Sequence, residues 1–182
     1  RKIVDEHFNP IIHKITHLMK PVVAAVNGVA AGAGANIALC CDIVVANNSA
    51  KFIQAFSKIG LIPDSGGTFF LPRLIGYQKA LALMLTGDPV SAEEAKNMGM
   101  IYDYYTIEEF DSKSKALAQK LANMPTKALG MTKKLVQLSL NNDITTQLGL
   151  EEEYQLQASL TVDYKEGVQA FMEKRKANFK GK

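Results

Sequence analysis

The stretch VVAAVNGVAAGAGANIALCCDIVVA, residues 22–46, decides the fold. It opens with the apolar segment VVAAV and closes with a second one, IVVA at 43–46, and such segments are typical of strands covered on both faces. Between them Asn27-Gly28 breaks the first strand, a loop of small residues follows at 30–34, and a short helix is predicted at 36–41. Strand, glycine loop, helix and strand make a β-α-β unit, which predicts an α/β fold.

Helical patterns dominate on both sides of this unit. Residues 3–19 are predicted to be helical up to Lys20-Pro21, because the residue before a proline is pushed out of the α region. Ser91 and Glu94 form a capping-box pattern that opens another helix. A third strand is predicted at 100–104, and further helices at 107–123, 125–139, 143–161 and 164–176. We therefore expect residues 1–106 to form a partial α/β core and residues 107–182 an all-helical region.

The composition is that of an ordinary globular domain. The chain has 182 residues, of which 47% are hydrophobic and 21% charged, and this excludes a disordered chain. Its apolar runs are too short for a bilayer span and no leader pattern is visible, so no membrane role and a cytoplasmic location are expected. The net charge of +3 is too small to indicate nucleic-acid binding. Residues 165–182 alone carry six Lys or Arg against two acids.

The cysteines and histidines predict neither a disulfide nor a metal site. Cys40 and Cys41 are adjacent, a spacing at which a disulfide is difficult, so two reduced thiols are expected. His13 and His17 are spaced to share one helix face, yet no further ligand nearby completes a set. We therefore expect no metal.

Two segments carry candidate chemistry. Gly28, Gly32 and Gly34 lie where a strand passes into a helix, and there glycine admits positive φ and close approach of an anion to backbone N–H groups. This pattern is neither a dinucleotide fingerprint nor a Walker motif. It indicates either close strand–helix packing or a pocket for an oxyanion. The second segment is IPDSGGT at 62–68, where Asp64 is either a turn or N-cap residue or a general base.

The general-base interpretation of Asp64 needs surroundings that favour proton transfer. Four apolar residues precede it closely enough to form a wall beside its carboxylate, and an apolar wall makes a carboxylate a better base. These residues are Phe52, Phe56, Ile59 and Leu61.

Taken in order, these segments resemble the crotonase, or enoyl-CoA hydratase/isomerase, superfamily. The resemblance rests on KPVVAAVNGVAAGAG (20–34), CDIVVA (41–46), AKF (50–52), GLIPDSGGT (60–68), LTG (85–87), SAEEAKNMGM (91–100) and EGVQAFMEKRKANF (166–179). It implies a crotonase-like ββα spiral core, incomplete at its N-terminus, followed by a helical trimerisation region. Phe56-Ser57-Lys58 and the 60–68 stretch look most like the phenylacetate-degradation isomerases that act on 1,2-epoxyphenylacetyl-CoA.

The resemblance implies roles for particular residues. The family holds the thioester carbonyl between two backbone N–H groups, the second of them at the position of Ala33. The first comes from an upstream segment that we expect to be missing from this sequence. Hydratases carry catalytic glutamates at the positions of Asn36 and Phe56, whereas the isomerase branch uses an acid at the position of Asp64. The residues expected to line the substrate pocket are Gly32, Gly34, Asn36, Phe56 and Leu61.

The resemblance therefore implies an acyl-CoA isomerase of the ring-epoxide or Δ3,Δ2-enoyl type, with Asp64 as the proton shuttle. A weakly active enoyl-CoA hydratase and a non-catalytic acyl-CoA-binding protein remain alternatives. Coenzyme A enters as part of the substrate, so no separate cofactor is expected. In the family, residues at the positions of Phe171 and Lys174 lie near the coenzyme A of a neighbouring subunit. A homotrimer or dimer of trimers is expected, with Leu150, Tyr154, Leu156 and Leu160 available for its interface.

Overall fold

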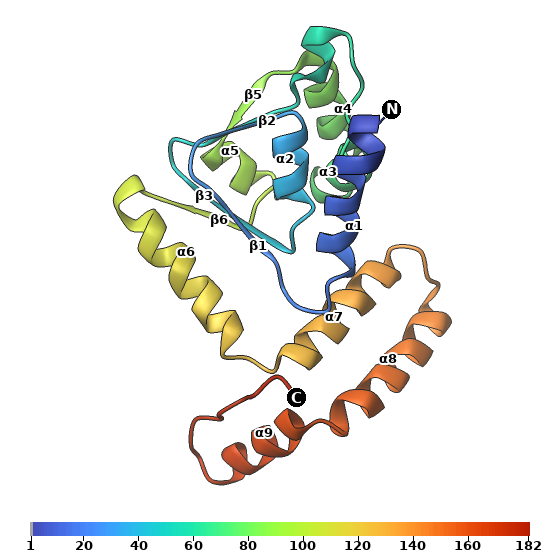
Figure 1. Ribbon diagram of the computed structural model, residues 1–182, viewed down its shortest axis with the longest axis vertical. Helices are drawn as coiled ribbons and strands as arrows, with labels where there is room; N and C mark the ends of the chain where they lie inside the picture. Colours follow the sequence, from blue (N-terminus) through green and yellow to red (C-terminus); the bar gives the residue numbers. More distant parts are fainter. Residues whose placement is uncertain (1) are drawn as a thin grey trace. The chain divides into compact units, whose positions relative to one another are not determined.

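A computed structural model describes residues 2–182 of the chain, which fold as two compact units (Figure 1). The first unit comprises the residues up to Thr16 together with Val22–Ala116, and the second comprises His17–Pro21 together with Leu117–Lys182. All strands of residues 2–182 belong to the first unit, whereas the second is helical. Each unit is described by itself below.

The first unit contains a parallel sheet of three strands in the order β1-β3-β6. Its strands are β1 (Val23–Val26), β3 (Ile43–Asn47) and β6 (Asp103–Tyr105). Val23 pairs with Ile43 in register, and the helix α2 (Ala33–Leu39) lies between β1 and β3 in the chain. The predicted β-α-β unit is therefore confirmed, and the third strand is confirmed with its start moved to Asp103.

A second sheet, which the sequence analysis missed, is built from three strands of three residues each. They are β2 (Val29–Ala31), β4 (Lys51–Ile53) and β5 (Pro89–Ser91), with β2 and β4 parallel and β4 and β5 antiparallel. The prediction of a loop over 30–34 was wrong in its first half. Ala30 is buried between exposed neighbours, which is the alternation of a short strand with one covered face.

Both sheets contribute to one hydrophobic core, in which small side chains allow the layers to approach closely. Val45 and Ala46 of β3 are fully buried, as expected for a strand covered on both faces. Ala35 of α2, Leu71 and Ala80 are likewise completely enclosed. The glycine loop and helix α2 are thereby held on a rigid base.

The first unit has further helices around this core. They are the π-helix η1 (Val4–Phe8), α1 (Asn9–His17), the 3-10 helix η2 (Ala55–Ile59), α3 (Gly67–Ile75), α4 (Tyr77–Thr86) and α5 (Ala92–Asn97). The capping box is confirmed, since Ser91 accepts from the Glu94 N–H and Glu94 accepts from the Ser91 N–H. Helix α3, which contains Pro72, was not predicted from the sequence.

The second unit is formed by the C-terminal helices. After α6 (Ile107–Ala122), which runs across the boundary between the units, come α7 (Thr126–Ser139), α8 (Ile144–Ser159) and α9 (Val162–Met172). The first three predicted helices are confirmed to within two residues, whereas the last begins earlier and ends at Met172. Helices α7 and α8 pack side by side (Figure 1).

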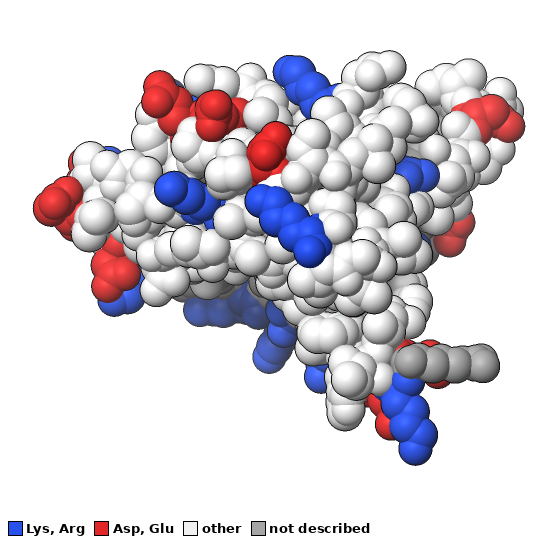
Figure 2. Space-filling view, turned by 90° about the horizontal axis from the view of Figure 1, so that it is seen from above, with Lys and Arg blue, Asp and Glu red and all other residues white. Residues whose placement is uncertain are grey.

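Several expectations about bonds and surfaces can be compared with the structure. Cys40 and Cys41 form no disulfide within the described chain. Among residues 2–182 no group of His, Cys, Asp and Glu side chains could hold a metal ion, and none of these helices could cross a membrane. Figure 2 shows a face on which uncharged residues predominate and both acidic and basic side chains are scattered.

Candidate active site

Asp64 lies in the loop that connects η2 to α3, at a turn with an unusual backbone. Its carbonyl accepts the N–H of Gly67 over 2.9 Å, and Ser65 and Gly66 inside this turn have φ of 50° and 75°. Ser65 is only 2% exposed, and its hydroxyl donates to Oδ1 of Asp64 over 3.0 Å. The turn therefore fixes both the backbone and the carboxylate of Asp64.

The structure bears on the alternative that Asp64 is merely a helix cap. The N-cap of α3 is Gly66, which has no side chain that could accept a hydrogen bond from the helix N–H groups. Asp64 contributes its carbonyl to the turn, while its carboxylate accepts from Ser65. The turn thus uses the backbone of Asp64 and does not use its carboxylate as a cap.

A buried side chain ties helix α2 to this turn. Nδ2 of Asn36 donates to the Asp64 carbonyl over 2.8 Å, and Oδ1 of Asn36 accepts from Nε2 of Gln54 over 2.8 Å. Asn36 is 1% exposed and Gln54 is 5% exposed. Gly67 lies directly against the Asn36 amide, because a Cβ at position 67 would be 2.7 Å from Cγ of Asn36.

The glycine run forms the entry to α2. Gly32 has a φ of 54°, which favours glycine, and its N–H donates to the Ile53 carbonyl over 2.9 Å. Ala33 follows as the first residue of α2. N–H groups in the first turn of a helix have no acceptor within the helix, so the Ala33 N–H has none within α2. Its role as an oxyanion donor stays a prediction.

The apolar residues near Asp64 divide into two groups. Phe52 and Phe56 are buried, and the ring of Phe56 is 3.7 Å from the place where a Cβ of Gly32 would stand. Ile59 and Leu61, by contrast, are exposed in this chain, at 72% and 59%. Two of the four predicted wall residues are therefore buried and two are exposed, and their position beside the Asp64 carboxylate stays a prediction.

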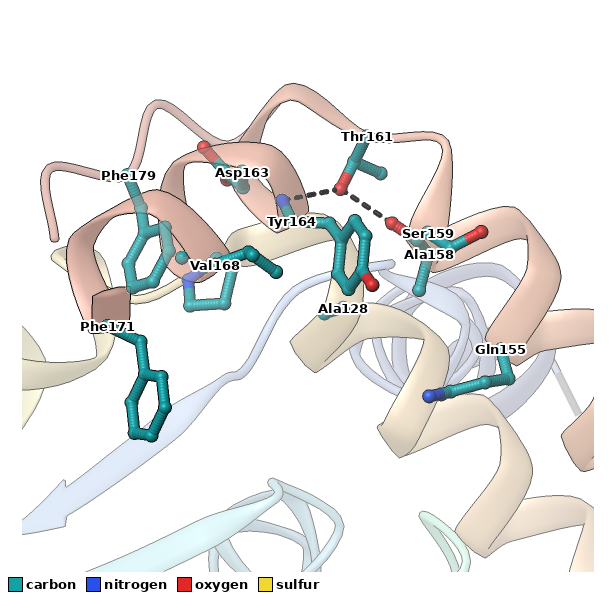
Figure 3. A pocket seen from close by; sticks show the side chains of 12 residues that line it. Ala128, Gln155, Ala158, Ser159, Thr161, Asp163, Tyr164, Val168, Phe171 and Phe179 are labelled. Atoms are coloured by element: carbon teal, nitrogen blue, oxygen red, sulfur yellow. Dashed lines mark hydrogen bonds between the residues drawn. The ribbon is translucent and has the colours of Figure 1, made fainter. Parts of the chain in front are cut away.

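The residues expected near coenzyme A belong to the second unit. Phe171 is 82% exposed and lines a cavity of about 440 Å³ together with Tyr164, Val168 and Phe179 (Figure 3). Lys174 follows the end of α9 with a φ of 54°. Their contact with coenzyme A stays a prediction.

The analysis of the sequence did not find Gln54 or Ser65. Gln54 stands between a strand and a 3-10 helix, with nothing in its neighbours to mark it, and its contact with Asn36 joins residues 18 positions apart. Ser65 had a detectable signal, because serine beside aspartate in a turn commonly makes a local side-chain hydrogen bond.

Comparison with known proteins gives the class. The profile of the enoyl-CoA hydratase/isomerase family matches residues 1–182, and the chain belongs to this family. The crotonase fold expected from the resemblance is confirmed by a crystal structure of the enoyl-CoA hydratase from Bacillus anthracis. That structure is 33% identical, with a TM-score of 0.92 over 100% of this chain and 72% of the other.

Within the family, relatives of two activities are similar to this chain. It is 48% identical over 179 residues to the 1,2-epoxyphenylacetyl-CoA isomerase of Escherichia coli K12, covering 98% of this chain and 68% of that protein. It is 37% identical over 169 residues to the crotonyl-CoA hydratase of Syntrophomonas wolfei, covering 93% and 65% respectively. Identity alone therefore gives the family and leaves isomerase and hydratase both open.

Proposed function

We propose that this protein is an acyl-CoA isomerase of the ring-epoxide or Δ3,Δ2-enoyl type, in which Asp64 moves the proton. One observation carries the proposal. The rigid turn presents the carboxylate of Asp64, while the positions of the two hydratase glutamates hold a buried asparagine, Asn36, and a buried phenylalanine, Phe56. Neither side chain can accept a proton from water, so this chain lacks both acids that a hydratase would use at these positions. The 48% identity to an isomerase agrees with this choice.

The mechanism follows from the stability of the enolate. Loss of a proton next to a thioester places negative charge on the carbonyl oxygen, and one preorganised donor lowers such a barrier by about 3–4 kcal/mol. The Ala33 N–H at the start of α2 is the proposed donor in this chain. For double-bond migration, Asp64 takes a proton from one carbon and returns it to another, so that no water is consumed and the carboxylate is regenerated.

The assembly belongs to the same proposal. We infer a homotrimer or dimer of trimers in which the helical region covers a neighbouring subunit. Leu156 and Leu160 are 64% and 74% exposed in this chain. Covering large exposed apolar side chains with a partner subunit stabilises the assembly. Leu150 and Tyr154 are already half-buried and contribute less. Light scattering that finds only a monomer at micromolar concentration would contradict the trimer.

The test of the activity is Asp64→Asn in the full-length protein. Asparagine keeps the size and turn preference of aspartate but removes the base, so isomerisation should fall by about 10²- to 10⁴-fold with acyl-CoA binding little changed. Hydration of crotonyl-CoA, measured beside double-bond migration, tests the hydratase alternative. Thermal stabilisation by acyl-CoA without any turnover in the parent would favour the binding-only alternative. Parental turnover in Asp64→Asn would end the proposed mechanism.

A further inference from the structure

The buried amides next to Asp64 have only one possible orientation. The Asp64 carbonyl can only accept, so Asn36 must turn Nδ2 toward it, over 2.8 Å. Asn36 then presents Oδ1 to Gln54, and Nε2 of Gln54 must donate to it, again over 2.8 Å. The direction of each bond in this chain of two amides is thus determined by the backbone of Asp64.

This arrangement leaves one polar atom unsatisfied. Oε1 of Gln54 is buried and has no hydrogen-bond partner within residues 2–182. A buried acceptor without a donor lowers stability, and apolar side chains of similar size would avoid that cost. The presence of two amides at this place is explained if the hydrogen bond from Asn36 to the Asp64 turn, which Gln54 supports, serves the site.

We propose that Asn36 and Gln54 are positioning residues for Asp64, a role that rests on the proposed function of Asp64 as the proton shuttle. Asn36 holds the carbonyl on one side of the turn, and Gly67 lies against the same amide. With the carbonyl held, the left-handed Ser65 can present its hydroxyl to the carboxylate. Misplacement of a reacting group by about 1 Å costs on the order of 10²-fold in rate, so this support matters for turnover.

Asn47 offers a matched control elsewhere in the first unit. It is also a buried asparagine, 6% exposed, and its Nδ2 also donates to a backbone carbonyl, that of Asn27, over 2.9 Å. The Asn27 carbonyl lies at the end of β1 and not in the Asp64 turn. A purely structural role predicts the same outcome for Asn36→Leu and Asn47→Leu, whereas a positioning role does not.

The experiment measures kcat, KM and the unfolding midpoint for both leucine variants in the full-length protein. Asn36→Leu should lower kcat by about 10- to 100-fold with a smaller change in KM, since both polar atoms of Asn36 are engaged by Asp64 and Gln54 and its loss misplaces the base. Asn47→Leu should lose comparable stability and keep the parental kcat. Gln54→Met, which keeps the length of the side chain, should lower kcat by a smaller factor, because Asn36 loses one of its two bonds.

Asn36→Asp provides a second route if the leucine variant does not fold. Aspartate has the shape of asparagine and, when ionised, presents only acceptors to the Asp64 carbonyl, so kcat measured at alkaline pH should be lowered too. Parental kcat in Asn36→Asp and Gln54→Met, with Asp64→Asn inactive, would overturn the positioning role and leave the proposed function standing. Parental kcat in Asp64→Asn would overturn both.

Discussion

Two non-glycine residues of the described chain have left-handed backbone, and their surroundings differ. Ser65 of the first unit has a φ of 50° and is buried, and Lys174 of the second has a φ of 54° and is exposed. Left-handed backbone costs an L-residue about 1–2 kcal/mol, so each must be held by its neighbours. Around Ser65 the turn is bonded to the neutral amide of Asn36, which in turn accepts from the neutral amide of Gln54.

Around Lys174 the neighbours are ionised. Residues 173–182, which we call the tail, turn back over α9, and Glu166 accepts from the Arg175 guanidinium over 2.6 and 3.0 Å and from the Asn178 N–H over 2.8 Å. Asp163, 2% exposed, accepts from the N–H groups of Lys180 and Gly181 over 2.6 and 2.8 Å. Lys174 itself lies in a helix C-terminal turn, in which its N–H donates to the Phe171 carbonyl and the Arg175 N–H to the Ala170 carbonyl. The Asp64 turn is therefore bonded to uncharged amides, whereas carboxylates hold the tail that follows Lys174.

This difference implies that pH and salt should act directly on the bonds that hold the tail, whereas the bond from Asn36 to the Asp64 carbonyl joins two groups that carry no charge. Amide groups do not titrate in the ordinary range, whereas carboxylates do. The predictions that follow test this contrast.

Gly67→Ala should give the largest effect, in the first unit. The new methyl group would overlap the Asn36 amide, which is buried and bonded at both ends and so cannot move aside. Such overpacking costs about 1–3 kcal/mol, and we expect the upper part of that range, together with a loss of isomerisation. Urea unfolding provides the measurement.

Gly149→Ala is the control for Gly67→Ala. Gly149 is helical and has no atom within 4 Å of an added Cβ, so alanine should stabilise the second unit by about 0.5–1 kcal/mol. Equal unfolding free energies for Gly67→Ala and the parent would contradict the close packing of Asn36 on Gly67.

Asp163→Asn should give the next largest effect, in the tail. The variant amide can accept only one of the two N–H groups and turns a donor toward the other. Hydrogen bonds to charged groups contribute about 1.5–3 kcal/mol, so the tail should detach more often. Limited trypsin digestion should then cleave after Lys176 and Lys180 faster than in the parent, and unchanged cleavage rates would argue against this anchoring.

Acidification should release the tail in a defined range. The Arg175 guanidinium and the Asn178 N–H lower the pKa of Glu166 from 4.5 to about 2. Because the folded pKa is below the unfolded value, the stabilisation by Glu166 is present above pH 4.5 and is lost as the pH falls toward 2. The Asn178 amide resonance should shift over this range, since the Asn178 N–H donates to the Glu166 carboxylate.

Glu166→Gln is the control for the acid titration. Glutamine keeps one acceptor for the Asn178 N–H but has no charge to lose, so the shift below pH 4.5 should disappear. A shift of the same size in this variant would assign the transition to another carboxylate.

Substitutions of Lys174 should give the smallest effect. Glycine at this position relieves the left-handed backbone and should stabilise the second unit by about 1 kcal/mol, whereas alanine should not. Both variants remove the charge, so if Lys174 contacts coenzyme A both should weaken acyl-CoA binding at low salt, where screening is weak. Parental affinity of both variants at low ionic strength would exclude that contact.

The sequence permitted a good prediction of those parts of the fold whose signals are local. The β-branched segments of β1 and β3, the Ser91–Glu94 box and the helices after Ile107 each carry their signal within a few residues. Strands β2, β4 and β5 have three residues each, and such a segment is too short to show a period. They exist because the first sheet and its helices place them side by side.

The site divides in the same way. Asp64 could be recognised from the sequence because it lies in a stretch of turn-forming residues and matches a family motif. The amide support was not, since Asn36, Gln54 and Asp64 meet only after α2 has packed on α3 and on the strands β1 and β2. Residues that act by positioning another residue form no regular sequence motif from which they could be recognised.

The hydrogen bond from the Asn36 amide to the Asp64 carbonyl also has a consequence for redesign. A hydratase-like glutamate at position 36 would have no hydrogen to donate when ionised, so it would face the carbonyl as a second acceptor. A turn in this conformation and an ionised acid at position 36 therefore exclude each other. Restoring both glutamates in place of Asn36 and Phe56 should not by itself recreate a hydratase, because the loop that follows would have to be rebuilt as well.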